Sequence, residues 1–373
     1  MRGVAILGST GSIGRSTLEV LRRQRDHFRV VALTAGRNRE LLDQQTAEWK
    51  PAFVGLVDGD DSPGGCYSRG AKCLVEAATR PDVDIVVNAV VGSTGLDATL
   101  GALRAGKRVA LANKETLVMA GELVTAAARE GGGELIPVDS EHSAVLQCVT
   151  GREVGLRRLI LTASGGPFRG WTAEALEQAT LKEALNHPTW RMGHKVTVDS
   201  ATLANKALEV IEAHHLFGLP YDDIEVVVHP QSIIHAFTEF CDGSVIAQLG
   251  FPSMELPILY ALTHPARLPD EGTRRFDPVA AGPLTFEPVR PDVFRAFRAG
   301  VAAGRAGGTA PAVFNAANEV TVAAFLAGRI PFGRIADTIE HVLDRHVAES
   351  PADLQAICAA DRWARATTHE DLA

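Results

Sequence analysis

Residues 4–14, VAILGSTGSIG, decide the fold of the N-terminal part of this chain. Val4–Leu7 predicts a buried strand, and Gly8, Gly11 and Gly14 follow where a helix should begin. Glycines in such a strand–turn–helix unit let the backbone approach a pyrophosphate, which sits at the positive end of the helix. The spacing is GxxGxxG, a variant of the more usual GxGxxG. The stretch therefore predicts a dinucleotide-binding turn at the start of a parallel sheet.

The first 150 residues continue this alternation of short apolar runs and helical patterns. Helices are expected, for example, at Arg15–Arg25 and Leu96–Ala105. Strands are expected at Val4–Leu7, Val30–Leu33, Phe53–Val57, Val83–Val91, Val109–Ala112 and Leu135–Val138. This order indicates an α/β fold with a doubly wound, Rossmann-like parallel sheet. Gly59–Gly70, rich in Gly, Asp and Ser, should form a surface loop.

The pattern changes after residue 150. Leu159–Thr162 reads as a strand, and Ile233–Phe240 and Ser244–Leu249 flank Asp242–Gly243, a hairpin turn signal. A sheet with a hairpin at its edge offers a surface for dimerisation. Six prolines within 265–291 indicate an extended connection, and helical patterns follow.

We therefore expect four segments along the chain. Residues 1–150 form the dinucleotide-binding domain and 151–264 a central α/β catalytic domain with a sheet. Residues 265–291 form a proline-rich linker, and 292–373 form a C-terminal helical domain.

Composition limits the classes of partner. The 373 residues are 46% hydrophobic and 22% charged, with a net charge of −8 and no basic block. A nucleic-acid partner is therefore not expected, and an anionic substrate must be held by a local site. The five cysteines form no CxxC pair, the first residues enter a strand directly, and no apolar run could cross a membrane. These features predict a cytoplasmic protein without a membrane partner.

The end of the second predicted strand bears on cofactor choice. Sites selective for NAD place a carboxylate here to bind the ribose 2′-hydroxyl, whereas this chain has Gly36, Arg37 and Asn38. The guanidinium of Arg37 suits a 2′-phosphate, which predicts NADPH as the cofactor. The alternative is an arginine that is merely solvated in a loop.

Residues 187–217, HPTWRMGHKVTVDSATLANKALEVIEAHHLF, carry the densest group of candidate site residues. A helix is expected to start at Asp199 and Ser200, both good capping residues, and its N-terminus would attract an anion. Ser200, Asn205 and Lys206 offer a hydroxyl, an amide and a cation for a phosphate, and Glu209 shares the face of Asn205 and Lys206. The alternative is an amphipathic helix with a solvated charged stripe.

A second acidic pair follows the last strand of the first domain. In an extended segment Asp139 and Glu141 would point the same way and converge on one ion. With Glu209 they form an oxygen ligand set that suits Mg²⁺ or Mn²⁺, with Co²⁺ as a further candidate. The alternative is a pair that caps a helix.

Two strand ends offer further polar groups. Ser164 and Gly165 supply a hydroxyl and backbone N–H groups to an anion, unless SGGP is a plain tight turn. Asn113, Lys114 and Glu115 close the strand before them, and Lys114 could bind a substrate hydroxyl or form an ordinary ion pair.

Four histidines remain ambiguous. His229 and His235 lie in VHPQSIIHA, where a core histidine and a ligand are equally compatible with the sequence. His214 and His215 end a helical pattern and are expected to interact with its dipole.

Taken together, the motifs resemble those of the 1-deoxy-D-xylulose 5-phosphate reductoisomerase family. GSTGSIG, AGRN, LANKE, VDSEHSA, SGGPF, the block from His187 to Ala213, HPQSIIHA and NAANEVTVAAFL occur in family order from Gly8 to Leu326. The resemblance implies an NADPH- and metal-dependent homodimer that converts 1-deoxy-D-xylulose 5-phosphate to 2-C-methyl-D-erythritol 4-phosphate in isoprenoid precursor synthesis. It also implies a retro-aldol/aldol rearrangement followed by hydride transfer.

The resemblance assigns roles by motif. Metal ligands would be Asp139, Glu141 and Glu209. Substrate would contact Ser140, Glu141, Ser164, Gly165, His187, Ser200, Asn205, Lys206 and Glu209. Catalytic residues would be Lys114, Glu141, His187, Trp190 and Met192, the last two on a flap at 184–194. NADPH would contact Thr10, Gly11, Ser12, Ile13, Gly36, Arg37, Asn38, Ala89, Asn113 and Glu115.

Two other functions are compatible with the first domain alone. One is another NADP-dependent oxidoreductase, such as a homoserine or semialdehyde dehydrogenase. The other is an NADPH-binding sensor without catalysis. Neither needs three carboxylates beside a phosphate site.

Overall fold

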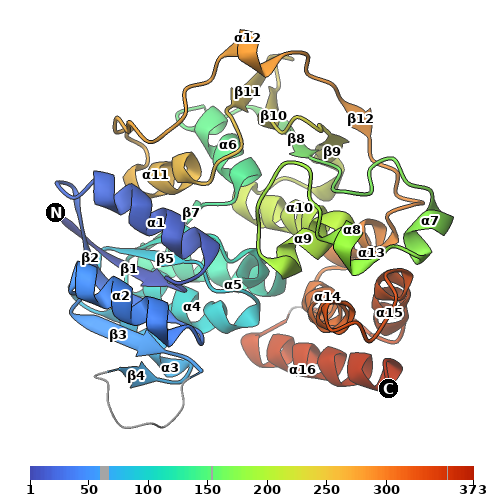
Figure 1. The fold of residues 1–373 in the computed structure, drawn as a ribbon, viewed down its shortest axis with the longest axis horizontal. Helices are drawn as coiled ribbons and strands as arrows, with labels where there is room; N and C mark the ends of the chain where they lie inside the picture. Colours follow the sequence, from blue (N-terminus) through green and yellow to red (C-terminus); the bar gives the residue numbers. More distant parts are fainter. Residues whose placement is uncertain (59–66, 153, 351) are drawn as a thin grey trace. The chain divides into compact units, whose positions relative to one another are not determined.

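The computed structural model describes residues 1–58, 67–152, 154–350 and 352–373 (Figure 1). The chain folds into two compact units, each built from segments that are separate in the sequence. The first unit consists of Met1–Thr116, Glu122–Leu146 and Ser253–Arg275. The second consists of Leu117–Gly121, Gln147–Pro252 and Phe276–Ala373.

A parallel sheet forms the centre of the first unit. Its seven strands in the described residues follow the order β4-β3-β2-β1-β5-β6-β7. They are β1 (Arg2–Leu7), β2 (Phe28–Ala35), β3 (Phe53–Leu56), β4 (Ser68–Arg69), β5 (Ile85–Asn88), β6 (Arg108–Leu111) and β7 (Glu134–Pro137). The side chains of Val4–Leu7 are completely buried, as expected for the middle strand of a sheet covered on both faces. The predicted doubly wound sheet is thereby confirmed.

Most helices of the first unit connect these strands. They are α1 (Ser12–Arg23), α2 (Arg39–Trp49), α3 (Lys72–Thr79), the short 3-10 helix η1 (Ser93–Gly95), α4 (Leu96–Arg104), α5 (Lys114–Gly131), α6 (Ser140–Val149) and α11 (Glu255–Thr263). Helix α11 packs on α1, so a segment far along the chain completes the apolar core of the first unit. Helices α5 and α6 each contribute residues to both units.

Two expectations for this unit need correction. Strand β5 ends at Asn88, earlier than the predicted Val83–Val91, because the Asn88 carboxamide accepts a hydrogen bond from the Val90 N–H (3.2 Å) and turns the chain. Ser68 and Arg69 are not loop but form β4 beside β3. Residues 59–66 of that predicted loop lie outside the described residues.

The second unit contains a mixed sheet with the strand order β11-β10-β8-β9-β12. The strands are β8 (Leu156–Ala163), β9 (Ile224–Val228), β10 (Ile234–Phe240), β11 (Val245–Leu249) and β12 (Glu287–Pro288). The predicted hairpin is confirmed as β10 and β11, joined at Asp242 and Gly243, where Gly243 has a φ of +83°. Strand β11 forms one edge of this sheet.

The helices of the second unit surround an apolar core of its own. They are α7 (Ala173–Glu177), α8 (Leu181–Ala184), α9 (His194–Ala201), α10 (Ala204–Phe217), η2 (Tyr221–Asp223), α12 (Pro278–Ala281), α13 (Arg295–Ala306), α14 (Ala310–Leu326), α15 (Gly333–Asp344) and α16 (Leu354–Asp371). The predicted helical C-terminal part is confirmed by α13–α16, with Pro311 in the first turn of α14. No helix in the described ranges is long and apolar enough to span a membrane.

The predicted helix start at Asp199 and Ser200 is wrong. Both residues lie in the last turn of α9, and α10 begins only at Ala204. Between the helices Leu203 adopts a left-handed conformation with φ of +57°, which interrupts the helical hydrogen bonding. The expectation rested on the capping preference of Asp199 and Ser200, which gives no sign of a helix that already precedes them.

Candidate active site

The glycine turn after β1 is held in the conformation that a dinucleotide site requires. Gly8 has a φ of +83°, and Gly11 is the N-cap of α1. A Cβ on Gly14 would lie 2.3 Å from the carbonyl oxygen of Gly8, so only glycine allows this close packing. The first turn of α1, with Ser12 and Ile13, therefore presents its N–H groups at the end of the sheet.

The buried side chain of Gln45, which no sequence motif marked, holds this turn through Ser9. The Ser9 hydroxyl donates to Gln45 Oε1 (2.7 Å), and Gln45 Nε2 donates to the Ser9 carbonyl (3.0 Å). Both side chains are buried. In the sequence Gln45 is an ordinary polar residue of a helix, and no motif marks it.

Two of the predicted cofactor residues, Arg37 and Asn38, lie in the turn after β2, and each contacts a nearby residue. Asn38 is the N-cap of α2 and accepts a hydrogen bond from the Leu41 N–H (3.1 Å). The Arg37 side chain is 87% exposed and its Nε atom lies 3.1 Å from Asp58 Oδ2. Asp58 was not anticipated from the sequence. Its contact occupies one of the five donors of the guanidinium and orients the others.

The segment after β5 is fixed by a buried asparagine. Asn113 is completely buried, and its Nδ2 donates to the carbonyls of Val90 and Gly92 (both 2.8 Å) and to Glu115 (3.1 Å). Ala89, next to this segment, lies against the glycine turn, because a Cβ on Gly8 would meet its carbonyl oxygen at 2.7 Å. Asn113 thus shapes the backbone that adjoins the predicted cofactor turn.

Asp139, Ser140 and Glu141 follow β7 and open α6. The expectation of an extended segment is wrong, because Ser140 and Glu141 already belong to the helix. Lys114, at the start of α5, forms an ion pair with Asp139, and the Ser140 hydroxyl donates to the Glu141 carboxylate. The Ser140 N–H donates to Asp139 Oδ1 (3.0 Å). Two carboxylates, a hydroxyl and an ammonium group therefore meet at one strand end of the first unit.

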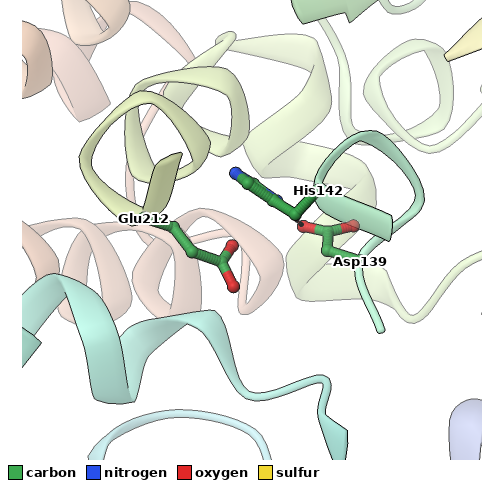
Figure 2. A group of neighbouring side chains, drawn as sticks. All are labelled: Asp139, His142 and Glu212. Carbon is green, nitrogen blue, oxygen red and sulfur yellow. Dashed lines mark ion pairs between the residues drawn. The ribbon is translucent and has the colours of Figure 1, made fainter. Parts of the chain in front are cut away.

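His142 is a neighbour of this cluster that the sequence reasoning passed over. It is completely buried on α6, and its Nδ1 atom lies 4.0 Å from Asp139 Oδ2 (Figure 2). Its place in VDSEHSA, one residue after Glu141, was the available signal.

In the second unit, two hydroxyls meet one imidazole. The Nε2 atom of His187 lies 3.0 Å from Ser164 Oγ and 3.2 Å from Ser200 Oγ. Ser164 directly follows β8 and Ser200 lies in the last turn of α9, and burial lowers the pKa of His187. The Ser164 hydroxyl also accepts a hydrogen bond from the Gly166 N–H (3.2 Å). Three residues that are distant in the sequence thus form one donor-rich cluster.

The SGGP turn contains two successive glycines with positive φ. Gly165 and Gly166 have φ values of +83° and +65°. A Cβ on Gly166 would lie 2.6 Å from the carbonyl oxygen of Ser200. The turn must therefore be glycine to bring the end of β8 against the end of α9.

Helix α10 contributes a buried charged group. Glu209 accepts hydrogen bonds from Asn205 and from Lys206, and Lys206 Nζ also donates to the Thr162 carbonyl (2.6 Å). Lys206 and Glu209 are both buried. The predicted common face is confirmed, and the solvated stripe is excluded. Removing either partner of such a pair is strongly destabilising, because the other charge would be left buried without compensation.

The loop that precedes α9 carries the predicted flap residues. The N–H groups of Thr189 and Trp190 donate to His187 Nδ1 (3.1 and 2.9 Å). The Trp190 ring lies 6.2 Å from that of His235. Met192 lies between Trp190 and the start of α9 at His194.

The structure shows the surroundings of His229 and His235, the two ambiguous histidines of HPQSIIHA. His229 accepts from the Ile233 N–H (3.1 Å) through Nε2, so its Nδ1–H donates to the Thr285 carbonyl (2.9 Å), and it is a structural residue. Burial lowers the pKa of His235 to about 4. His214 contacts the Leu219 carbonyl through Nδ1 (2.6 Å) at the end of α10, which agrees with the expected position at a helix C-terminus.

Comparison with known proteins extends over the whole chain. A family described as 1-deoxy-D-xylulose 5-phosphate reductoisomerase matches residues 4–121, and two C-terminal domain families of the same enzyme match residues 135–217 and 249–367. A 1-deoxy-D-xylulose 5-phosphate reductoisomerase from Symbiobacterium thermophilum is 52% identical over 383 residues, which cover 99% of this chain and 98% of the relative. The chain belongs to the 1-deoxy-D-xylulose 5-phosphate reductoisomerase family.

Further members of the family support the same conclusion. The protein of that name from Geobacillus kaustophilus is 50% identical and is matched over 98% of both chains. A crystal structure of DOX-P reductoisomerase in complex with NADPH, fosmidomycin and magnesium superposes with a TM-score of 0.94 at 38% identity, covering 100% of this chain and 98% of the other. A reductoisomerase from Zymomonas mobilis in complex with NADPH gives 0.90 at 40% identity, covering 100% and 99%. The resemblance predicted from the motifs is confirmed, and the chain is an enzyme of this family.

Proposed function

We propose that the chain converts 1-deoxy-D-xylulose 5-phosphate to 2-C-methyl-D-erythritol 4-phosphate with NADPH and a divalent cation. The observation that carries this proposal is the cluster of Ser164, His187 and Ser200 in the second unit. The hydroxyls of Ser164 and Ser200 both lie within 3.2 Å of the His187 imidazole, and α9, which carries Ser200, packs on the helix that bears Asn205 and Lys206. Such a convergence of short-range donors is suited to the oxygens of a phosphate monoester.

We assign the divalent cation to Asp139, Glu141 and Glu209. The donor set fits, because three carboxylates without cysteine are the preference of Mg²⁺ and Mn²⁺. A related DOX-P reductoisomerase was crystallised with magnesium. When bound, the cation would polarise the substrate ketone and stabilise negative charge on its oxygen.

We assign NADPH to the first unit. Support comes from the glycine turn, from Arg37, and from two related reductoisomerases crystallised with NADPH. The cofactor would supply the hydride that reduces the aldehyde formed by rearrangement. The predicted contacts of Thr10, Gly36, Ala89 and Glu115 remain part of this proposal.

Other residues of the chain would bind the substrate, donate hydrogen bonds to it and exclude water. Lys114 and Ser140 would bind the substrate hydroxyls during a retro-aldol and aldol rearrangement of the carbon skeleton. His187 would donate from Nε2 to substrate oxygen, because its Nδ1 already accepts two backbone N–H groups. Trp190 and Met192, on the flap, would exclude water and retain the aldehyde until its reduction.

We also propose the setting in which the reaction takes place. The enzyme would act in the cytoplasm as a homodimer, with the β10–β11 hairpin at the dimer surface, and the four predicted segments would keep the roles given to them. Sedimentation of the purified protein at micromolar concentration tests the dimer, and a monomer mass would contradict it.

A nicotinamide absorbance assay tests the reaction itself. NADPH oxidation is expected with 1-deoxy-D-xylulose 5-phosphate and Mg²⁺ or Mn²⁺, and it should stop on chelation and return with added metal. Homoserine and semialdehyde substrates serve as the matched panel. Turnover of one of those substrates instead, or turnover that persists in chelator, would contradict the proposal.

A further inference from the structure

A buried contact in the second unit joins the C-terminal helices to the helix that bears Ser200. Asn318, on α14, donates from Nδ2 to Asp199 Oδ1, on α9, at 2.9 Å. The side chain of Asn318 is completely buried and that of Asp199 is 1% exposed. The two residues are 119 positions apart in the sequence. A hydrogen bond to a buried carboxylate is among the stronger kinds, because its alternative is an unsatisfied charge.

Asn318 is not needed to neutralise Asp199. Lys195, one turn earlier on α9, already forms an ion pair with the second carboxylate oxygen (2.8 Å). What the neutral carboxamide adds is direction, since its Nδ2 fixes where the first oxygen points. Among the described residues the Asn318 Oδ1 atom has no hydrogen-bond partner, so the amide is placed for Asp199 alone.

Asp199 in turn organises the turn between α9 and α10. Its carbonyl accepts from the Thr202 hydroxyl (3.1 Å), which itself accepts from the Ala204 N–H (3.2 Å). Leu203, inside the turn, has the left-handed conformation. Ser200 lies before the turn, and Asn205 and Lys206 lie after it. The geometry of this turn therefore sets the spacing between the hydroxyl of Ser200 and the groups on α10.

We propose that Asn318 is a positioning residue for phosphate recognition. It holds Asp199, and through it the α9–α10 turn, so that Ser200 faces the same anion as Asn205 and Lys206. This inference rests on the proposed phosphate site. It assigns to the C-terminal helical part of the enzyme a role in substrate affinity, through α14, without contact with the substrate.

The same helix offers a matched control. Asn315 is also completely buried on α14, one turn earlier, and it donates to Glu319 Oε1 (3.0 Å) instead of to α9. Among the described residues its Oδ1 likewise has no hydrogen-bond partner. Replacing either asparagine by leucine, which has a similar shape, removes one buried amide from α14. Only Asn318→Leu removes the contact with Asp199.

The test uses the full-length enzyme with metal and NADPH. Three quantities are measured for each variant. Calorimetry gives the dissociation constant of inorganic phosphate, and steady-state kinetics with the sugar phosphate give KM and kcat. Thermal unfolding gives the thermal midpoint. For Asn318→Leu we expect the phosphate dissociation constant and KM to rise about tenfold, because Ser200 would no longer be held in place to donate one hydrogen bond to the phosphate. The kcat value and NADPH affinity should change by less than about twofold, which is within ordinary scatter. Asn315→Leu should lower the thermal midpoint to a similar degree and leave phosphate binding unchanged.

The outcomes separate this inference from the function on which it rests. Wild-type enzyme that turns over the substrate while Asn318→Leu and Asn315→Leu bind phosphate equally well would overturn the inference alone. Wild-type enzyme that neither binds phosphate nor turns over the sugar phosphate would overturn the proposed function as well. Should Asn318→Leu fail to fold, Asn318→Ala and Asn315→Ala provide the same comparison. If Asn318→Ala leaves phosphate affinity at the wild-type value, the positioning role is refuted.

Discussion

The backbone N–H of Trp190 donates a hydrogen bond to Nδ1 of His187 at 2.9 Å. A second N–H, that of Thr189, reaches the same nitrogen at 3.1 Å. A ring nitrogen that accepts hydrogen bonds carries no proton, so the neutral ring must hold its proton on Nε2. That proton faces the hydroxyls of Ser164 and Ser200. The backbone at Thr189 and Trp190 therefore sets the tautomer of a residue in the proposed phosphate site.

His187 should accordingly be a neutral Nε2–H tautomer at pH 7. Burial lowers its pKa below the usual 6.5, and protonation would place a second donor against two N–H groups. Nitrogen NMR of histidine-labelled enzyme is expected to show a protonated Nε2 and an unprotonated Nδ1. A doubly protonated ring at pH 6.5, or an Nδ1–H tautomer, would contradict this assignment.

Acid should destabilise the second unit before its carboxylates are titrated. Burial lowers the pKa of His215 and of His235 to about 4 in the folded protein, whereas each titrates near 6.5 when unfolded. The unfolded state then binds more protons below pH 6.5, so the free energy of unfolding should decrease as pH falls from 6.5 towards 4. A shift of this size corresponds to about 3 kcal/mol per histidine.

Urea unfolding between pH 7.5 and 4 measures this slope. His215→Asn and His235→Gln should each flatten it, whereas replacement of the exposed His341 should not. An equal slope in all four proteins would show that other groups are responsible.

Glu209→Gln should reduce turnover by about a hundredfold or more, the scale of losing a ligand or orienting group of a metal site. The substitution also removes the carboxylate that pairs with Lys206. NADPH affinity, measured by fluorescence, should remain nearly unchanged. Glu225→Gln, on the exposed side of β9, is the matched control. Near-normal turnover of Glu209→Gln would remove Glu209 from the proposed metal site.

Arg37→Gln should lower kcat/KM for NADPH by about tenfold or more while changing that for NADH little, because a charge-assisted contact to the 2′-phosphate is lost. Asp58→Asn, which removes the partner of Arg37, should cause a smaller loss. Arg22→Gln, an exposed arginine paired with glutamates on the same unit, should change neither value. An NADH preference in the wild-type enzyme would refute the assignment of Arg37.

Gly14→Ala should abolish tight NADPH binding and lower the thermal midpoint. The added methyl group would lie 2.3 Å from the Gly8 carbonyl, so the turn must open. Gly170→Ala serves as the control, because a Cβ there meets nothing within 4 Å. Calorimetric titration with NADPH tests both variants. Unchanged affinity in Gly14→Ala would show that the turn does not hold the cofactor.

The first sheet was predictable because its strands are short apolar runs. The turn after its first strand was predictable because its glycines allow the close backbone packing that other residues would prevent. The α9–α10 break was not predictable, since Leu203 is a residue that rarely adopts a positive φ and the helical periodicity continues through it. The helical position of Glu141 was missed for a related reason. Strand β7 ends at Pro137 and α6 begins only three residues later, at Ser140, so too few residues separate them for periodicity to mark the boundary.

Some of the candidate site residues could likewise be grouped from the sequence, and others could not. Asn205, Lys206 and Glu209 could be grouped from the sequence because their contacts follow from helical spacing. Gln45, Asp58 and Asn318 could not, because each acts on a partner from another element and carries no motif. Contacts across elements depend on the tertiary packing, which one sequence does not encode locally.

The glycine at position 166 has a consequence for engineering. Because its missing side chain lets a strand end touch the carbonyl of Ser200, the two segments cannot be redesigned one at a time. A variant library aimed at new sugar phosphates would have to keep this position constant. Diversity is better placed where an added side chain meets open space, as at Gly170 and Gly193.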